Sequence, residues 1–186
     1  QVQDYATAMR AWKKLTIAEM SNEDLVAAAN TAQAAGDRES RDLWLAEEQK
    51  RGLDNTEHYW WLHAQRYLPK DPKQALADFD RAIAAEPTAR AYSSRAAVHR
   101  ELNNSQAAVD DLRQALILEP ENSATQAALG YALWDNDEIA QSRDVLEKAH
   151  KAMPDDPGLI KQLAYVSQRL DDIPGTQSYA RQVIDD

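Results

Sequence analysis

Cysteine is missing from all 186 residues, which excludes disulfide bonds and thiolate metal sites within them. Positive charge is also scarce, because 21 lysines and arginines stand against 31 aspartates and glutamates, for a formal net charge of −10. A chain of this charge repels the phosphates of nucleic acids, and no cluster of basic and aromatic residues offsets that repulsion locally. We therefore expect no nucleic-acid partner, and anionic membrane surfaces are disfavoured for the same reason.

Long apolar runs are absent too, since none approaches the ~20 residues of a membrane span. We therefore do not expect these residues to cross a membrane. Glycine and proline number only five and seven, while alanine, leucine, glutamine and glutamate are abundant, which favours helices over sheets. Because the sequence begins with Gln1 rather than methionine, and a helical pattern runs to Asp186, we expect a piece of a longer protein.

Three similar segments, each ending in proline, indicate an internal repeat. They are DPKQALADFDRAIAAEP (71–87), NSQAAVDDLRQALILEP (104–120) and EIAQSRDVLEKAHKAMP (138–154). The prolines are 33 and 34 residues apart, as are Phe79, Leu112 and Leu146. Small and large residues recur at helical spacing in each segment, so each is predicted to be a helix that ends near its proline. Since another apolar-periodic helix precedes each one, the repeating unit is a helix pair of about 34 residues.

This unit resembles the tetratricopeptide repeat, in which the first helix has a small residue at its eighth position and the second helix closes with proline. In the repeat that opens at Ser123, the matching residues are Leu129, Gly130, Leu133, Ser142, Leu146, Ala149 and Pro154. The resemblance implies an all-α fold, a right-handed superhelix of helix-turn-helix repeats called an α-solenoid. We predict one array with a partial repeat or helix at 1–21, repeats at 22–55, 56–88, 89–122 and 123–156, and a repeat-like helix pair at 157–186.

Local signals refine this prediction. Residues 3–19 are expected to form the second helix of an earlier repeat, and a terminal helix is expected from about Pro174. Ser21 or Asn22 can cap the helix that follows, while Gly36 and Gly52 suit a turn and a helix end. Gly130 costs roughly 1 kcal/mol against alanine in a helix. We explain it by a close approach of the two helices of its repeat, with Ala64, Ala96 and Ala164 at the same position.

In such an array the first helix of each repeat lines the concave wall, where extended ligands bind. The second, fifth, ninth and twelfth positions of these helices are predicted to face it. Our candidate ligand-binding residues are His58, Trp61, Gln65, Arg90, Arg100, Tyr131, Trp134, Lys161 and Tyr165. The same positions hold Glu23, Val26, Asn30, Gln33, Leu68, Ser93, Ala97, Ala124, Ala127, Gly158 and Gln168.

Aromatic rings, amides and a few cations on one wall suit either sugar rings or a peptide with apolar side chains. Alternatively, Tyr131, Trp134 and Tyr165 only close contacts between repeats. A known type of this repeat binds a peptide carboxylate with lysine and asparagine. Asn30 stands at one of its positions, but Val26 replaces the lysine, which makes this reading weak.

The sequence predicts no catalytic residue, metal site or cofactor. His58 and His63 are five apart on one helix and diverge, so a shared metal is not expected. Four pairs of adjacent aspartates point in different directions on a helix or sit at its ends, and we assign them solvated or capping roles. These pairs are Asp110–Asp111, Asp155–Asp156, Asp171–Asp172 and Asp185–Asp186.

The stretch 127–186 carries a second resemblance, in the words GYALWDN (130–136) and AYVSQRLDDIP (164–174). It is similar to the region between the repeats and the membrane barrel of Gram-negative outer-membrane proteins of the exopolysaccharide-export type. The resemblance implies a place on the periplasmic side of the outer membrane and a parent protein with a membrane barrel. Its implied partners are the exopolysaccharide or an envelope protein, such as an inner-membrane glycosyltransferase, and a phage adsorption protein.

Both lines of reasoning predict a non-catalytic binding scaffold, which takes part in exopolysaccharide export and serves as a phage receptor by resemblance. Its concave groove would bind a glycan or a partner protein. A generic peptide-binding adaptor in complex assembly is the alternative, and an all-α enzyme acting on glycans is a third reading.

Overall fold

The computed structural model describes residues 5–68 and 70–184, and in these residues it contains eleven α-helices, one short 3-10 helix and no strand. The prediction of an all-α fold is confirmed. Our expectations about Gln1 and about the pair Asp185–Asp186 lie outside the described residues. Within the described ranges, none of the helices combines the length and the apolar character that crossing a bilayer requires.

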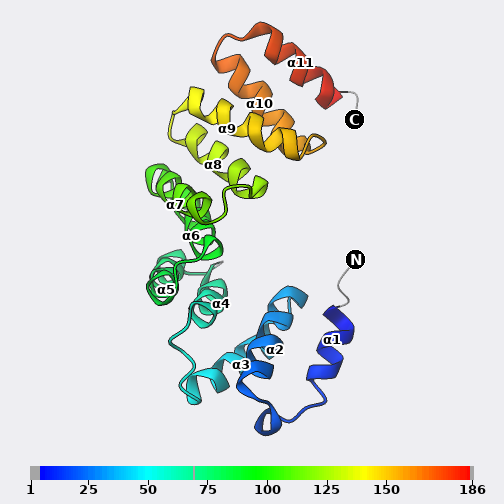
Figure 1. The fold of residues 1–186 in the computed structure, drawn as a ribbon, viewed down its shortest axis with the longest axis vertical. Helices are drawn as coiled ribbons and strands as arrows, with labels where there is room; N and C mark the ends of the chain where they lie inside the picture. Colours follow the sequence, from blue (N-terminus) through cyan, green and yellow to red (C-terminus); the bar gives the residue numbers. More distant parts are fainter. Residues whose placement is uncertain (1–4, 69, 185–186) are drawn as a thin grey trace. The chain divides into compact units, whose positions relative to one another are not determined.

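The chain divides after Pro87 into two compact units. Unit 1 contains α1 (Tyr5–Trp12), the 3-10 helix η1 (Ile17–Glu19), α2 (Asn22–Ala35), α3 (Arg38–Lys50), α4 (Glu57–Tyr67) and α5 (Pro72–Ala85). In Figure 1, α2 pairs with α3 and α4 pairs with α5, while α1 packs against α2. Each pair is one predicted repeat.

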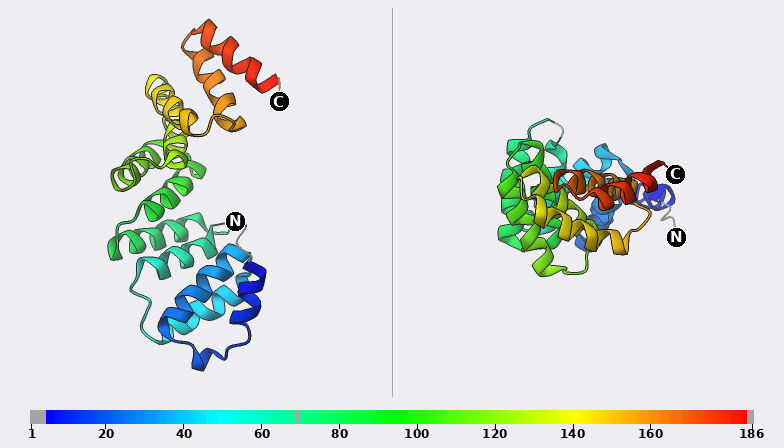
Figure 2. Two further views of the ribbon diagram at one scale, coloured as in Figure 1. Left: turned by 45° about the vertical axis from the view of Figure 1, so that its right-hand side comes forward. Right: turned by 90° about the horizontal axis from the view of Figure 1, so that it is seen from above.

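Unit 2 contains α6 (Ala89–Glu101), α7 (Ser105–Leu118), α8 (Ser123–Asp135), α9 (Ile139–Ala152), α10 (Pro157–Arg169) and α11 (Ile173–Ile184). The left view of Figure 2 shows α10 and α11 side by side, and α6 packs against α7 and α8 against α9 in the same way. The segments 71–87, 104–120 and 138–154 form α5, α7 and α9, as predicted, and α11 begins next to the expected Pro174.

Helix ends follow the expected capping residues. The Ser21 hydroxyl accepts a hydrogen bond of 3.1 Å from the backbone N–H of Asp24, so Ser21 caps α2. Gly36 and Gly52 both have φ of 72°, a left-handed conformation that suits glycine after a helix. Two predicted acid pairs also cap helices, because Asp156 accepts from Leu159 N–H at 2.9 Å and Asp172 accepts from Gly175 N–H at 3.1 Å.

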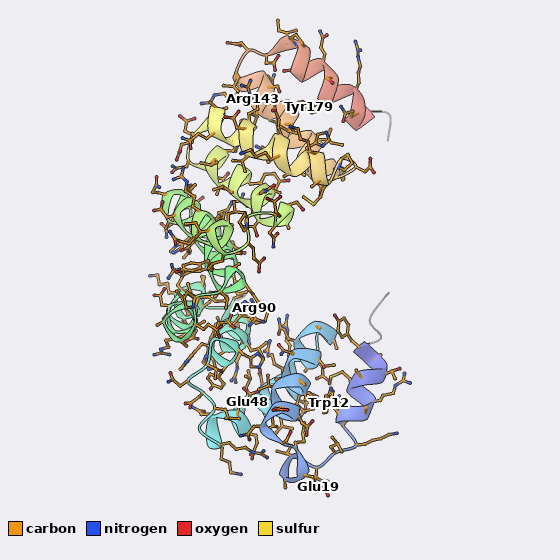
Figure 3. All side chains as sticks on the ribbon, viewed as in Figure 1. Trp12, Glu19, Glu48, Arg90, Arg143 and Tyr179 are labelled. Carbon is orange, nitrogen blue, oxygen red and sulfur yellow. The ribbon has the colours of Figure 1, made fainter. Side chains whose placement is uncertain are left out.

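The first helix is shorter than predicted. Instead of continuing to residue 19, α1 ends at Trp12, and the short helix η1 starts after Thr16. The Thr16 hydroxyl donates to the Glu19 carboxylate at 2.6 Å, which favours a new helix start at this point. The indole N–H of Trp12, labelled in Figure 3, donates to the Thr31 hydroxyl at 3.3 Å and ties α1 to α2.

Gly130 lies where α8 and α9 approach each other closely, as predicted. A Cβ atom on Gly130 would lie 2.5 Å from Cδ2 of Leu146, and Leu146 is fully buried. The Gly130 carbonyl also accepts a hydrogen bond of 2.7 Å from the Ser142 hydroxyl. Ala64 and Ala96 are fully buried at the same repeat position, whereas Ala164 is only partly buried.

The seventh position of the first helix, one residue before the small residue, is polar in two repeats and pairs with an aspartate of the second helix. The sequence analysis did not predict these pairs. In the α4–α5 pair, His63 Nδ1 lies 2.8 Å from Asp78 Oδ2. In the α6–α7 pair, Arg95 Nε donates to Asp111 Oδ2 at 2.9 Å. The equivalent residues of the α8–α9 pair are apolar, Leu129 and Val145, and belong to one core cluster.

Asp111 therefore contradicts our assignment of a solvated or capping role. It is 5% exposed and bonded to Arg95, while its neighbour Asp110 is exposed. Helical spacing places Asp111 on the same face as the buried Ala108 and Ala115, which is a signal that was present in the sequence.

Gly130→Ala is expected to lower the free energy of unfolding by about 2 kcal/mol, because the added methyl group overlaps the buried Leu146 side chain. Urea unfolding of the chain measures this change. In a Leu146→Ala background the same substitution should be neutral or stabilising, since the space is then free and alanine favours the helix. A Gly130→Ala variant as stable as the original chain would refute the close-approach explanation.

Asp111→Ala is expected to cost about 3 kcal/mol of stability, because it leaves the part-buried Arg95 guanidinium without this carboxylate. The double variant Arg95→Leu/Asp111→Val copies the apolar pair of the next repeat and should recover to within about 1 kcal/mol of the original chain. Asp110→Ala is the matched control and should change stability by less than about 0.5 kcal/mol. Equal losses for Asp110→Ala and Asp111→Ala in chemical denaturation would contradict this account.

Candidate functional site

Unit 1 has a pocket of about 420 Å³ between the first half of α2 and the loop that leads into α4. The predicted positions Glu23, Val26 and Asn30 line it. Its other lining residues are Asn22, Ala27, Leu53 and Thr56. Val26, Ala27 and Leu53 give the pocket an apolar lining.

Hydrogen bonds hold both walls of this pocket. The backbone N–H of Leu53 donates to the Glu48 carbonyl at 2.9 Å, and the Thr56 hydroxyl accepts from Tyr59 N–H at 3.1 Å. Arg51 donates to the carbonyls of Met20 and Ile17 at 2.7 and 2.8 Å. The loop is therefore tied to the last turn of α3, the start of α4 and the segment before α2.

Negative charge lies at the rim of the pocket. Hydrogen bonds from the side chain and backbone of Ser21 hold the pKa of the Asp24 carboxyl below its usual range, so this group is ionised at neutral pH. Glu23 follows the cap of α2, where the helix N-terminus favours a carboxylate.

Unit 2 has a pocket of about 330 Å³ at the corresponding place, between the first half of α6, the loop before α8 and the start of α8. The predicted positions Arg90, Ser93 and Ala124 line it, and Arg90 is labelled in Figure 3. Its other lining residues are Ala89, Ser94, Glu119, Asn122, Thr125 and Ala128. The Asn122 side chain bridges this wall, accepting from Thr125 N–H at 3.0 Å and donating to Glu119 at 2.8 Å.

The two pockets occupy equivalent places in their repeats. Each is built from the first, second, fifth and sixth positions of a first helix, together with the residue that caps the next first helix. That cap is Thr56 in unit 1 and Asn122 in unit 2. The predicted register therefore identifies surface positions that line pockets in both units, whereas the cap and loop residues lie outside it.

Two of the predicted aromatic residues are partly buried against the hydrophobic core. Tyr131 and Trp134 pack against a cluster that includes Leu146, Leu159 and Leu163. Our placement of Ala127 on the groove is wrong, because it is 8% exposed and belongs to this cluster. α10 packs against α9 and, less extensively, against α8. This packing agrees with the alternative in which these aromatic residues close contacts between repeats.

The predicted cations have contacts of their own. Arg100 donates through Nε to Asp135 Oδ2 at 2.8 Å, and its guanidinium lies 5.7 Å from the centre of the Tyr131 ring. Lys161 Nζ lies 6.0 Å from the centre of the Tyr165 ring. Tyr165 is 47% exposed, so it is the predicted aromatic residue most available to a ligand in unit 2.

The three predicted residues of α4 are all partly buried. Trp61 packs against the core cluster of unit 1. His58 Nε2 lies 3.7 Å from an oxygen of the buried Glu48, whose position Figure 3 labels. Gln65 is the third. None of the three lines the pocket between α2 and α4, so their role in binding stays a prediction.

The pocket residues outside the predicted register are the helix caps, the loop residues before them, and several further positions of the first helices. These further positions are Asn22, Ala27, Ala89, Ser94, Thr125 and Ala128. Leu53 and Glu119 precede these caps by three residues, and the first-helix register does not reach them. Thr56 and Asn122 could have been found, because a threonine or asparagine just before an apolar-periodic segment is a signal for a helix start.

Burial raises the pKa of the Tyr131 hydroxyl above its ordinary value of about 10, and the charge of Asp156 adds to the effect, while Arg100 opposes it. A raised folded-state pKa means that the folded state holds this proton more tightly than the unfolded state. Its contribution to stability is therefore complete below about pH 10 and is lost as the pH rises through the folded-state pKa.

We expect Tyr131→Phe to remove part of this alkaline loss of stability. Urea unfolding from neutral to strongly alkaline pH should show a smaller decline for Tyr131→Phe than for the original chain, because phenylalanine has no proton to release. Arg100→Met should raise the Tyr131 pKa further in a spectrophotometric titration. Identical pH profiles for the original chain and Tyr131→Phe would show that this hydroxyl is not shielded from solvent.

Known proteins resemble this chain in sequence and in fold. No protein-family model matches it. In sequence, it is 63% identical over all 186 residues to Bacteriophage adsorption protein A of Escherichia coli strain K12. The matched part is 19% of that protein, so the chain spans about a fifth of its length. It is also 25% identical over 143 residues to a TPR repeat-containing protein of Pseudomonas aeruginosa, covering 76% of this chain and 22% of that protein.

Two solved structures share the fold. PilF of Pseudomonas aeruginosa matches with a TM-score of 0.76 at 17% identity, over 88% of this chain and 75% of that one. YrrB, described as a TPR protein with an unusual peptide-binding site, matches with a TM-score of 0.73 at 13% identity, over 100% and 93% of the two chains. At these identities the likeness shows the fold alone. The chain is therefore a tetratricopeptide-repeat solenoid, similar in sequence over its whole length to a part of Bacteriophage adsorption protein A.

Proposed function

We propose that this chain is a non-catalytic docking scaffold that binds an extended segment of a protein partner along the first helices of its repeats. The supporting observation is the recurrence of one pocket, at the same place in a repeat, in both units. Residues predicted from the repeat register line both pockets, and extended ligands suit the surface that first helices offer in such arrays.

The contacts of two buried acids fit this role. Asp78 is bonded to His63, and Asp111 is bonded to Arg95, inside helix pairs. Acids that hold two helices together in this way are part of the packing. A scaffold role also fits the coarse function that the tetratricopeptide-repeat relatives share.

We infer a cell-envelope setting from the similarity to an adsorption protein of Escherichia coli. In this proposal the chain lies on the periplasmic side of the outer membrane and belongs to a phage receptor that takes part in exopolysaccharide export. Its partner would be an envelope protein, such as an inner-membrane glycosyltransferase, or a phage adsorption protein.

A glycan is the second candidate ligand, and one observation favours it. Tyr165 is 47% exposed beside Lys161, so its ring can stack on a sugar while the ammonium group binds a hydroxyl. Tyr131 and Trp134 offer less surface, because both pack on the core cluster of α8, α9 and α10. The protein segment is therefore the stronger candidate.

Nuclear magnetic resonance titration of the labelled chain separates these candidates. We expect extended synthetic peptides to shift backbone resonances of α2, α6 and the loops before α4 and α8, with little effect on the exposed faces of α5 and α7. Neutral and amino-sugar oligosaccharides, titrated in parallel, should leave those resonances unchanged. Shifts confined to Tyr131, Trp134 and Tyr165 with oligosaccharides would favour the glycan, and peptide-induced shifts confined to second helices would overturn the proposal.

A further inference from the structure

The equivalent pockets of the two units differ in chemistry at each of three corresponding positions. Where α2 has Glu23 at its second position, α6 has Arg90. At the fifth position Val26 corresponds to Ser93, and in the loop Leu53 corresponds to Glu119. Different side chains at equivalent positions indicate that the two pockets accept different groups.

The unit 1 pocket suits an apolar side chain. Val26 and Leu53 are partly buried and Ala27 is exposed, so together they form an apolar surface that is still open to solvent. An incoming aliphatic side chain would remove that surface from water, which is the main source of favourable free energy at such sites. In unit 2 the corresponding serine and glutamate would lose hydration instead.

The same pocket has free negative charge beside it. Within the described ranges, the Glu23 carboxylate has no hydrogen-bond or ion-pair partner, and neither does that of Asp54, which follows Leu53. The adjacent Asp24 is ionised. Arg51 lies near Asn22, but Glu47 neutralises it at 2.9 Å and two carbonyls take its other donors. A cation that arrives next to the pocket therefore meets uncompensated carboxylates.

We propose that the unit 1 pocket selects a partner segment in which an aliphatic side chain stands next to lysine or arginine. This inference rests on the proposed function and specifies its ligand chemistry. An aliphatic residue of the segment can enter the pocket, while the long, flexible side chains of the basic residues beside it bend back along the surface toward Glu23 in the lining and Asp54 next to Leu53. The unit 2 pocket has only alanines as apolar lining residues, and its Arg90 would repel the basic residues of such a segment.

Three synthetic peptides test the selection, all titrated against the labelled full chain. The first is Gly-Ser-Lys-Leu-Lys-Ser-Gly, the second has serine in place of leucine, and the third has glutamates in place of both lysines. We expect the first to bind at α2 and the loop before α4, and each replacement to weaken binding by about tenfold through lost apolar burial or added repulsion. Raising the salt concentration should weaken the first peptide, since its cations interact with exposed acids.

Exchanging the lining residues between the two pockets tests whether these residues determine which peptide binds. Glu23→Arg/Val26→Ser/Leu53→Glu gives unit 1 the lining of unit 2 and should abolish the preference for the first peptide. Glu39→Arg/Leu43→Ser is the matched control, because it makes similar changes at exposed positions of α3 and should leave binding unchanged. Arg90→Glu/Ser93→Val/Glu119→Leu should create a second site in unit 2, seen as new shifts in α6, which keeps the test valid even where the unit 1 variant unfolds.

The outcomes separate this inference from the proposed function. Peptide binding at the first helices with no preference among the three peptides would overturn the inference and leave the docking scaffold in place. Equal loss of binding in the α3 control would also overturn it. A complete lack of peptide-induced shifts in either unit would overturn both.

Discussion

The close approach of the two helices within each repeat is the contact on which the remaining structure depends. It requires a residue with little or no side chain on the first helix, which is why Ala64, Ala96 and Gly130 stand there. Once the pair is closed, large residues such as Leu146 fill the space beside it. The faces that remain then pack against the neighbouring repeat or stay open to solvent.

Because the outer faces of a first helix either pack against the next repeat or stay open to solvent, the same residues can belong to the core in one repeat and to a ligand-binding surface in another. In α2 the second, fifth and ninth positions stay open and line a pocket. In α8 the fifth position, Ala127, is buried. Tyr131 and Trp134 pack against the same core cluster, to which α10 contributes Leu159 and Leu163. The repeat register thus tells which positions are able to face a ligand, while the packing of the next repeat decides which of them do.

Much of the fold could be predicted from the sequence because the same helical pattern recurs in several repeats. The period of the prolines and the small residues placed α5, α7 and α9, and capping residues placed the start of α2. The end of α1 was missed, since Thr16 and Glu19 start a new helix where apolar spacing alone suggested continuation. The pocket residues Leu53 and Glu119 were missed because loops carry no helical period, so their place depends on how neighbouring repeats stack.

The polar pairs at the seventh repeat position have a consequence for assembly. Repeats of similar sequence can exchange helices during folding, so that a first helix docks on the second helix of another repeat. Here Arg95 matches Asp111, whereas docking on α9 would place its guanidinium against Val145. Leu129 on α7 would leave the Asp111 carboxylate buried without its partner. The α6–α7 and α8–α9 pairs are therefore distinguished from each other by charge, and an exchange of helices between these two pairs is penalised.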